Sequence, residues 1–372
     1  MLIYQFTMCS TIFSKFKVTG ISFLAVAMVL VSCKDGAKKE ASTMSEAEPA
    51  SKRIQLVSNE ADRSVEVMID GKHFTSYIYP KNIKKPVLYP LITPQGTKIT
   101  RKFPLEPSVG ERVDHPHHVG VWFNYGDVNG LDFWNNSDSI KVAEREHYGT
   151  IIHKSIDKIT EGDDEASLDV TMDWVAPDGK VLLKENTTFI FKGEGDVFSI
   201  DRITRLTAQD EKVTFKDNKE GMLGIRTTRE LEHPSDKPGV FTDANGIATK
   251  VEALDNKGVN GNYLNAEGIE GEDTWAKRSN WVNLRSKIGD EDISLVILDN
   301  KSNVGYPTYW HSRGYGLFAA NPLGQAVFSD GKEVLNFELD KGESTTFKHR
   351  IIVASKNLDK TDLDSRFEAF SK

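Results

Sequence analysis

The sequence predicts an all-β protein, a large antiparallel sandwich of two sheets (a β-supersandwich) with a short C-terminal helix. Short segments that alternate between apolar and polar residues recur along most of the chain. Turn sequences such as Asp70-Gly71 separate these segments at the spacing of β-hairpins. No glycine-rich phosphate loop leads from a strand into a helix, so nothing favours a Rossmann or P-loop fold. Many short strands in one long chain are typical of a two-sheet sandwich.

Residues 1–33 have the features of a bacterial lipoprotein signal peptide. Lys15 and Lys17 precede an apolar run, 21–31, that is too short to span a bilayer comfortably. The run ends at Leu30-Val31-Ser32-Cys33, which resembles a lipobox and implies cleavage before Cys33 and lipidation of its sulfur. The alternative is an ordinary secretory signal with an incidental cysteine. We therefore expect a protein that is anchored to a membrane of the bacterial envelope, in the periplasm or at the outer-membrane surface.

The rest of the chain is expected to comprise a tether, one β-sandwich domain and a tail. Residues 34–52 are rich in Lys, Ala, Ser and Glu without periodicity, which is typical of a disordered tether. The β-sandwich is expected over 53–356. Because the chain has no cysteine besides Cys9 and Cys33, the domain should fold without a disulfide. A net charge of −8 without a basic face argues against nucleic acid as a partner.

Within the domain, turn residues mark the ends of the expected strands. These strands lie at 64–69, 73–79, 87–92, 168–175, 181–191, 197–206, 293–298, 335–339 and 345–353. The last two should form a hairpin around Lys341-Gly342. Residues 255–265 are expected to be a loop, either a lid over a site or a surface excursion. The tail, 357–372, has helical spacing, with Leu358, Leu363, Phe367 and Phe370 as its apolar positions.

A cluster of histidines is the first candidate site. Asp114, His115, His117 and His118 lie together around a proline, which disfavours helix at the preceding residue. Imidazole transfers protons near neutral pH and is the commonest metal ligand. On an extended segment His115 and His117 would share one face, with His118 opposite. A divalent metal at His115 and His117 is possible, although no cofactor is required. The alternative is a surface loop, but the nearby Trp122, Asn124 and Trp134 favour a walled pocket.

Two further segments carry charged and aromatic residues in strand-like sequence. In 215–226, Glu220 and Arg226 are candidates for function, and a solvated strand edge is the alternative. In 306–317, Tyr309, His311 and Arg313 have the same parity, so a strand would place them on one side, with Tyr315 nearby. Aromatic, arginine and histidine side chains together suit a sugar ligand. The alternative there is a buried strand with a satisfied core histidine.

These segments resemble a bacterial family of unknown function that is catalogued as methane oxygenase PmoA-like. The resemblance rests on 114–118 followed by 126–134, on 217–226, and on 278–282 with 315–322. An oxygenase subunit of that name should span a membrane, but no spanning segment follows the signal. The closing strands, with Leu339, Gly342 and Arg350, are similar to those of galactose-mutarotase-like β-supersandwiches. That similarity implies a sugar site on a concave sheet.

The resemblance implies an exported carbohydrate-active enzyme that acts on oligosaccharides from plant or algal polysaccharides. The residue set favours elimination by a lyase or dehydratase, with a base, an acid and a cation to hold negative charge. We expect the base to be His115, His117 or His118 and the acid to be Tyr309 or His311. Arg226 and Arg313 would bind an anion, and Glu220 would orient a histidine. The other substrate contacts would come from Asp114, Trp122, Asn124, Trp134 and Tyr315. A mutarotase or epimerase, a glycoside hydrolase, a non-catalytic glycan-binding lipoprotein and a metal-dependent oxygenase are the alternatives.

Overall fold

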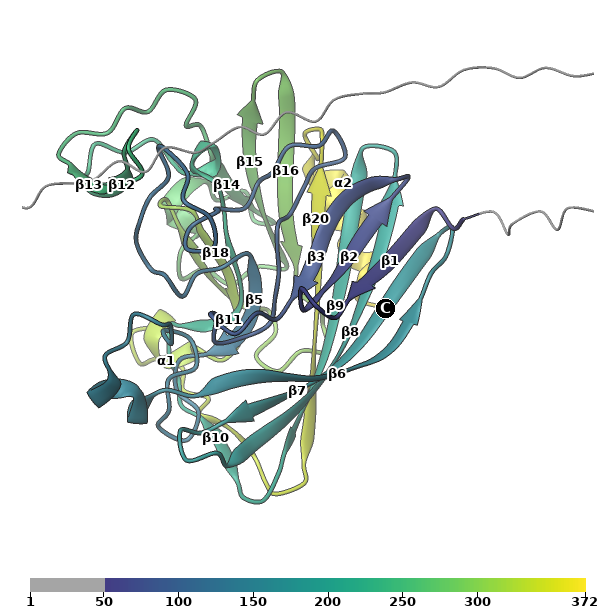
Figure 1. Ribbon diagram of the computed structural model, residues 1–372, viewed down its shortest axis with the longest axis vertical. Helices are drawn as coiled ribbons and strands as arrows, with labels where there is room; N and C mark the ends of the chain where they lie inside the picture. The colour runs from purple at the N-terminus through teal and green to yellow at the C-terminus, as the bar shows by residue number, and fades with distance from the viewer. Residues whose placement is uncertain (1–50) are drawn as a thin grey trace, which may run out of the picture. The chain divides into compact units, whose positions relative to one another are not determined.

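Two large antiparallel sheets dominate the structure, a computed structural model that describes residues 51–372 (Figure 1). The predicted signal peptide, its lipidation site Cys33 and nearly all of the predicted tether lie outside the described residues. Within 51–372, no helix is both long and apolar enough to cross a membrane. The predicted all-β class, with two antiparallel sheets and a short C-terminal helix, is confirmed.

The first sheet has eight strands and carries most of the candidate residues. In spatial order its strands are β1 (Ile54–Asn59), β2 (Ser64–Ile69), β3 (Lys72–Ile78), β4 (Val87–Leu88), β5 (Val121–Tyr125), β11 (Gly221–Arg226), β18 (Leu317–Asn321) and β17 (Tyr309–Arg313). Because β11 lies between β5 and β18, the sheet brings three distant sequence segments side by side.

The second sheet also has eight strands. Its order is β14 (Asn262–Asn265), β15 (Trp281–Ile288), β16 (Glu291–Leu298), β20 (Ser344–Ala354), β9 (Val197–Ala208), β8 (Val181–Glu194), β7 (Glu165–Val175) and β6 (Thr150–Thr160). Two small sheets pair β10 (Val213–Phe215) with β19 (Phe337–Leu339) and β12 (Gly239–Thr242) with β13 (Ala248–Val251). The helical segments are η1 (Val142–His147), η2 (Arg229–Leu231), η3 (Gly271–Thr274), α1 (Gln325–Phe328) and α2 (Lys360–Phe370).

The main core lies between the two large sheets. Phe123 on β5 contacts Trp174 on β7 and Phe347 on β20, with ring centroids 6.5 and 5.9 Å apart. Successive residues of a strand point to opposite faces, so Trp122 and Asn124 lie on the outer face of the first sheet. Trp122 accordingly belongs to a separate hydrophobic cluster on that face. The alternation that buries the core also supplies the residues of the candidate site.

The C-terminal tail packs against the domain. Leu363 and Phe367 of α2 are buried in a cluster with Trp281 of β15, whose indole N–H donates to the Asp364 carboxylate at 2.9 Å. The predicted helical spacing is confirmed, and the tail is continuous with the sandwich in its packing.

Three predicted elements differ from the structure. The expected hairpin of 335–339 with 345–353 is wrong, because β19 pairs with β10 while β20 joins the large sheet between β16 and β9. The aromatic contact of Phe337 with Phe215, 5.9 Å between ring centroids, favours that alternative partner. The strand expected at 87–92 ends at Leu88, before Pro90, which has no N–H for the ladder. The expected loop 255–265 ends in a strand, β14.

Candidate functional site

One row of residues across four strands forms the floor of the candidate site. Trp122 on β5 is in register with Gly224 on β11, which in turn faces Ala319 on β18 and then His311 on β17. A Cβ atom at Gly224 would lie 2.5 Å from the Trp122 ring and 3.0 Å from that of Trp134. The small residue in the middle of the row therefore allows the two indoles to lie over the sheet.

The buried side chain of Arg101 holds residues 114–118, the histidine turn, in place. Its guanidinium donates to the Asp114 carboxylate at 2.7 Å and to four backbone carbonyls, those of Asp114, His115, His118 and Arg112, at 2.8, 2.9, 3.0 and 3.3 Å. Arg101 is 2% exposed, so these bonds replace its hydration. The sequence reasoning missed Arg101, because no motif distinguishes it in a loop 13 residues before Asp114.

Asp114 lies between two buried arginines. Its Oδ1 accepts from Arg101 at 2.7 Å and from Arg226 at 2.6 Å, and its Oδ2 lies 3.3 Å from Nδ1 of His115. Burial alone would raise the pKa of Asp114, but the His115 hydrogen bond and the two guanidinium charges outweigh it and hold the pKa well below its usual range. Asp114 is therefore a permanent anion that orients His115.

The histidines are arranged by a tight turn. The His118 N–H donates to the His115 carbonyl at 2.9 Å, and His115 has φ +42°, a left-handed conformation that is rare for non-glycine residues. The ring of His115 lies parallel to that of His118 at 4.8 Å and perpendicular to that of His117 at 5.6 Å. The expectation that His115 and His117 share a face opposite His118 is wrong, because the segment turns where extended backbone was assumed.

The stack of rings continues on both sides of this pair. His115 also lies parallel to Tyr315 at 5.2 Å, and His118 lies parallel to Trp122 at 5.1 Å. The column therefore runs from Tyr315 through the two imidazoles to Trp122. Residues strained in φ and held by several contacts are concentrated at functional sites.

His118 is neutral and is a hydrogen-bond donor. Its Nδ1 lies 3.2 Å from Nη1 of Arg226, and since a guanidinium can only donate, Nδ1 accepts and the proton is on Nε2. Burial, and then the neighbouring His117, hold the pKa of His118 well below its usual range. Nε2 of His118 and the indole N–H groups of Trp122 and Trp134 are buried, and among the described residues they have no partner.

His115 and His117 differ in exposure. The His115 side chain is 41% exposed, and its Nδ1 faces Asp114, which leaves Nε2 free. Burial lowers the pKa of His117 to about 2, with a further contribution from Lys85. The Lys85 ammonium donates to the His117 carbonyl at 2.7 Å and lies 5.5 Å from the centre of the Trp122 ring. Burial lowers the pKa of Lys85 itself to about 7, and the sequence reasoning missed this residue too.

Of the third segment, Tyr315 contacts His115, while His311 lies on β17, three strands from β5. His311 donates from Nδ1 to the Lys219 carbonyl at 2.9 Å, and burial lowers its pKa to about 3. Glu220, predicted to orient a histidine, comes only within 4.0 Å of the same nitrogen and is paired with Lys219. The parity prediction is confirmed for this strand, since Tyr309 and His311 both contact Phe328 on the outer face while Trp310 packs into the core.

Two predicted residues have structural partners. Asn124 is fully buried and donates to the Phe133 carbonyl at 2.6 Å. Tyr309 stacks on Phe328 at 5.4 Å and lies under the guanidinium of Arg278 at 4.3 Å. Their contacts place them in the scaffold around the site.

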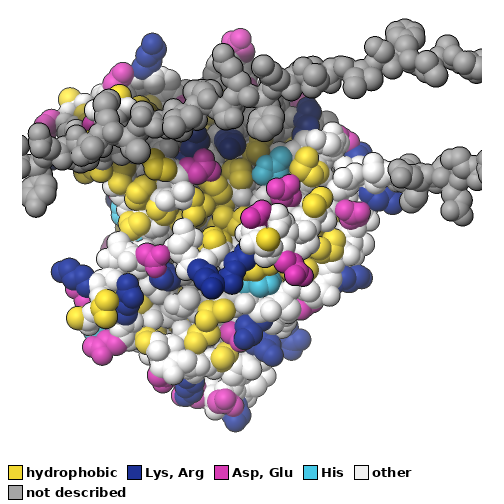
Figure 2. Space-filling model, viewed as in Figure 1, with side chains coloured by type: hydrophobic (Ala, Val, Ile, Leu, Met, Phe, Trp, Pro, Cys, Tyr) yellow, Lys and Arg dark blue, Asp and Glu magenta, His cyan; other side chains and the backbone are white. Residues whose placement is uncertain are grey.

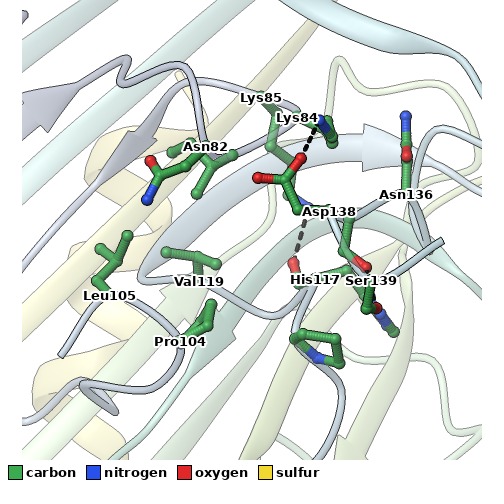
Figure 3. A pocket seen from close by; sticks show the side chains of 13 residues that line it. Asn82, Lys84, Lys85, Pro104, Leu105, His117, Val119, Asn136, Asp138 and Ser139 are labelled. Atoms are coloured by element: carbon green, nitrogen blue, oxygen red, sulfur yellow. Dashed lines mark hydrogen bonds and ion pairs between the residues drawn. The ribbon is translucent and has the colours of Figure 1, made fainter. Parts of the chain in front are cut away.

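Two cavities flank the histidine turn. A cavity of about 280 Å³ includes His117 in its lining, and Figure 3 shows it from close by. A second, of about 610 Å³, is lined by Tyr315 and Arg313 together with Arg112. In Figure 2, hydrophobic side chains gather on one face of the molecule and are bordered by charged ones. His115 is in ring contact with a residue of each cavity, which places it between them.

The side chains of the described residues do not converge on a point where a metal ion could bind. Within 51–372, no group of three or more His, Cys, Asp or Glu side chains is placed so as to hold an ion. The two histidines named as possible ligands, His115 and His117, have perpendicular rings.

Comparisons with known proteins establish the family but no activity. No curated protein matches the sequence significantly. One similar solved structure is the galactosidase domain of an alpha-galactosidase–sucrose kinase, AgaSK, with a TM-score of 0.40 and 10% sequence identity. Another is the GH36 alpha-galactosidase AgaB from Geobacillus stearothermophilus, with a TM-score of 0.39 and 10% sequence identity. Each match covers 82% of this chain and 42% of the other, so this chain spans less than half of their length. The protein Slr1438 from Synechocystis sp. PCC 6803 is also similar, with a TM-score of 0.29 and 12% sequence identity. That match covers 83% of this chain and 98% of Slr1438. At these TM-scores the likeness carries no argument about function.

A protein-family model also matches the chain, and the match covers most of the domain. It extends over residues 64–368 and is described as a family of unknown function, DUF6807. The methane oxygenase PmoA-like name and the activity it suggests stay predictions. Since the match includes the histidine turn, β11, β17 and most of α2, the chain belongs to the DUF6807 family of unknown function.

Proposed function

We propose that this protein is an exported, lipid-anchored enzyme that acts on oligosaccharides of complex polysaccharides by elimination. The observation that carries the proposal is the arrangement of Asp114, His115 and Tyr315. An accessible imidazole is oriented by a permanent carboxylate and lies parallel to a phenol at the edge of a cavity. A base with a free nitrogen and an acid with a bound proton are the two groups that elimination needs.

In the proposed reaction His115 is the base. Its Nε2 takes a proton from a sugar carbon beside a carbonyl or carboxylate group, the electron pair forms a carbon–carbon double bond, and the bond to the neighbouring oxygen breaks. The Tyr315 hydroxyl gives its proton to that leaving oxygen. Burial raises the pKa of Tyr315 to about 12, so the phenol keeps its proton at neutral pH until it is transferred.

The arginines have different parts in this proposal. Arg226 is fully buried, bonds Asp114 and lies 5.0 Å from the centre of the Tyr315 ring, so it positions the base and stabilises a developing phenolate. Arg313 is partly exposed and lines the cavity beside Tyr315, where it can bind the anionic group of a substrate. His118 and His117 support the turn, and the base among the three predicted histidines is His115.

The two carboxylates predicted for the site, Asp114 and Glu220, favour elimination over glycoside hydrolysis. A hydrolase of the usual kind needs two carboxyl groups at the scissile bond, one of them protonated. Asp114 is held as an anion by Arg101 and Arg226, and Glu220 is paired with Lys219. Epimerisation is the second candidate, because removal and return of a proton uses the same His115 and Tyr315.

Mass spectrometry of reaction products tests the proposal. The full-length protein is incubated with a panel of plant and algal oligosaccharides, with and without a uronic acid. A product lighter by one water, or a pair of fragments of which one has an unsaturated end, is expected. Unchanged masses with an altered anomeric or epimer ratio by NMR would replace elimination with epimerisation. Retention of an oligosaccharide without any change would instead support a glycan-binding lipoprotein.

A further inference from the structure

The smaller cavity has two chemically different walls. In Figure 3, Pro104, Leu105 and Val119 lie on one side of the pocket, and His117, Asp138, Ser139 and Asn136 lie on the other. A volume of about 280 Å³ is just below the ~300–1,000 Å³ that is typical of ligand pockets. The space therefore suits one sugar ring, and its lining distinguishes the two edges of that ring.

The polar wall has groups left over for hydroxyls. The Lys85 amino group donates one proton to the His117 carbonyl, and even as a neutral amine it has a second proton to donate. Lys84 pairs with Asp138 at the rim, and the hydroxyls of Ser137 and Ser139 lie 2.7 Å apart. Each of these groups can bond a ring hydroxyl without losing its present partner.

Pro104, Leu105 and Val119 offer no such group, and Asn82 is the polar residue drawn beside them in Figure 3. Leu105 and Val119 come from opposite ends of the loop that contains the histidine turn. Val119 belongs to the hydrophobic cluster that includes Trp122, and Leu105 packs against that cluster. A hydroxymethyl group placed against Leu105 and Val119, away from the Asn82 amide, would lose its hydration without a hydrogen bond, whereas a methyl group would lose nothing polar. A wall of this kind selects against the hydroxylated form.

We infer that this cavity is a subsite for a sugar ring that carries a methyl group, a 6-deoxyhexose or an O-methylated hexose. The methyl group contacts Leu105 and Val119, and the ring hydroxyls face Lys85 and Asp138. The choice of a sugar as the ligand rests on the proposed function. His117 joins this subsite to His115, so the methylated unit is adjacent to the bond that reacts.

Binding measurements on the full-length protein test the inference without turnover. The probes are free monosaccharides in matched pairs, L-fucose against L-galactose and 6-O-methyl-D-galactose against D-galactose, titrated by calorimetry or by ligand-observed NMR. We expect the methyl-bearing member of at least one pair to bind about 10-fold or more tightly. The pair that shows the preference distinguishes the deoxy from the O-methyl form. Equal affinities within both pairs, or no binding of any of the four, would overturn the inference.

Substitutions locate the preference. Leu105→Asn, which keeps the size of a partly buried side chain, should reduce the preference to less than about 3-fold, and Val119→Thr should act in the same direction. Val109→Asn is the matched control, because Val109 is an exposed apolar residue of the same loop outside this cavity. A preference that survives in both cavity variants would contradict the assignment. If the protein converts oligosaccharides but binds both members of each pair equally, only the methyl-sugar subsite is refuted. If it prefers the methyl-bearing sugars but converts no oligosaccharide, only the proposed reaction is refuted.

Discussion

The imidazole of His115 and the phenol ring of Tyr315 are stacked, with an angle of 4° between their planes and their centroids 5.2 Å apart. The two residues come from a loop before β5 and from the turn between β17 and β18, about 200 positions away. The contact fixes the distance between a candidate base and a candidate acid. It therefore gives each of them a separate test.

Replacement of His115 by asparagine should abolish turnover with little loss of stability. Removal of a general base costs about 10²- to 10⁴-fold in rate, and the half-exposed side chain contributes little to the core. Product formation by mass spectrometry and thermal unfolding of the same preparations measure the two effects. His73→Asn is the control, since that histidine bonds only Ser76 on β3. Normal turnover in the His115→Asn enzyme would remove it from the role of base.

The hydroxyl of Tyr315 can be tested apart from its ring. Tyr315→Phe keeps the stack on His115 and removes only the proton to be donated, so kcat should fall about 10²-fold or more while KM changes little. If Tyr315 served only to hold the imidazole in place, the phenylalanine variant would keep the wild-type kcat, and only Tyr315→Leu would be impaired. Steady-state kinetics of both variants decide between the two roles.

Asp114 should stabilise the fold as well as orient His115. Asp114→Asn leaves Arg101 and Arg226, both buried, without their carboxylate, and breaking such a group costs about 3–5 kcal/mol. The pKa of Asp114 is depressed in the folded state, so its contribution is present above the unfolded pKa of about 3.9 and is lost as the pH falls through the folded pKa. Denaturant unfolding at pH 7 and in the acid range should show the difference between wild type and Asp114→Asn shrinking at low pH. A difference that stays constant with pH would contradict the assignment.

The sequence predicted the parts of the site that depend on local periodicity. The parity of 309–313 placed His311 and Arg313 on one side of a strand, and the structure has them on the outer face of the first sheet. The all-β class followed from hairpin turns such as Asp70-Gly71, which joins β2 to β3. These features need only strand geometry, which the order of residues specifies.

Features that depend on non-local contacts were missed. Arg101 and Lys85 reach the histidine turn from separate loops, and no spacing in the sequence relates them to it. The orientation of the three histidines was predicted wrongly, because His115 has a left-handed φ that a non-glycine residue adopts only when surrounding contacts impose it. The pairing of β19 with β10 likewise depends on packing across the fold.

Lys85 predicts an unusual pH dependence of stability. Burial lowers its pKa to about 7 in the folded protein, against about 10.4 in the unfolded chain. Between these values the unfolded state binds a proton that the folded state does not, so this residue makes the free energy of unfolding rise with pH from about 7 to about 10. Lys85→Met keeps the buried apolar stem and should remove that rise, which denaturant unfolding at pH 7, 8 and 9 measures. Lys84→Met removes the partly exposed lysine next to Lys85, which pairs with Asp138; it serves as the control and should leave the wild-type slope. An identical slope in wild type and Lys85→Met would mean that the ammonium remains charged beside the Trp122 ring throughout this range, and that its bond to the His117 carbonyl offsets the cost of burial.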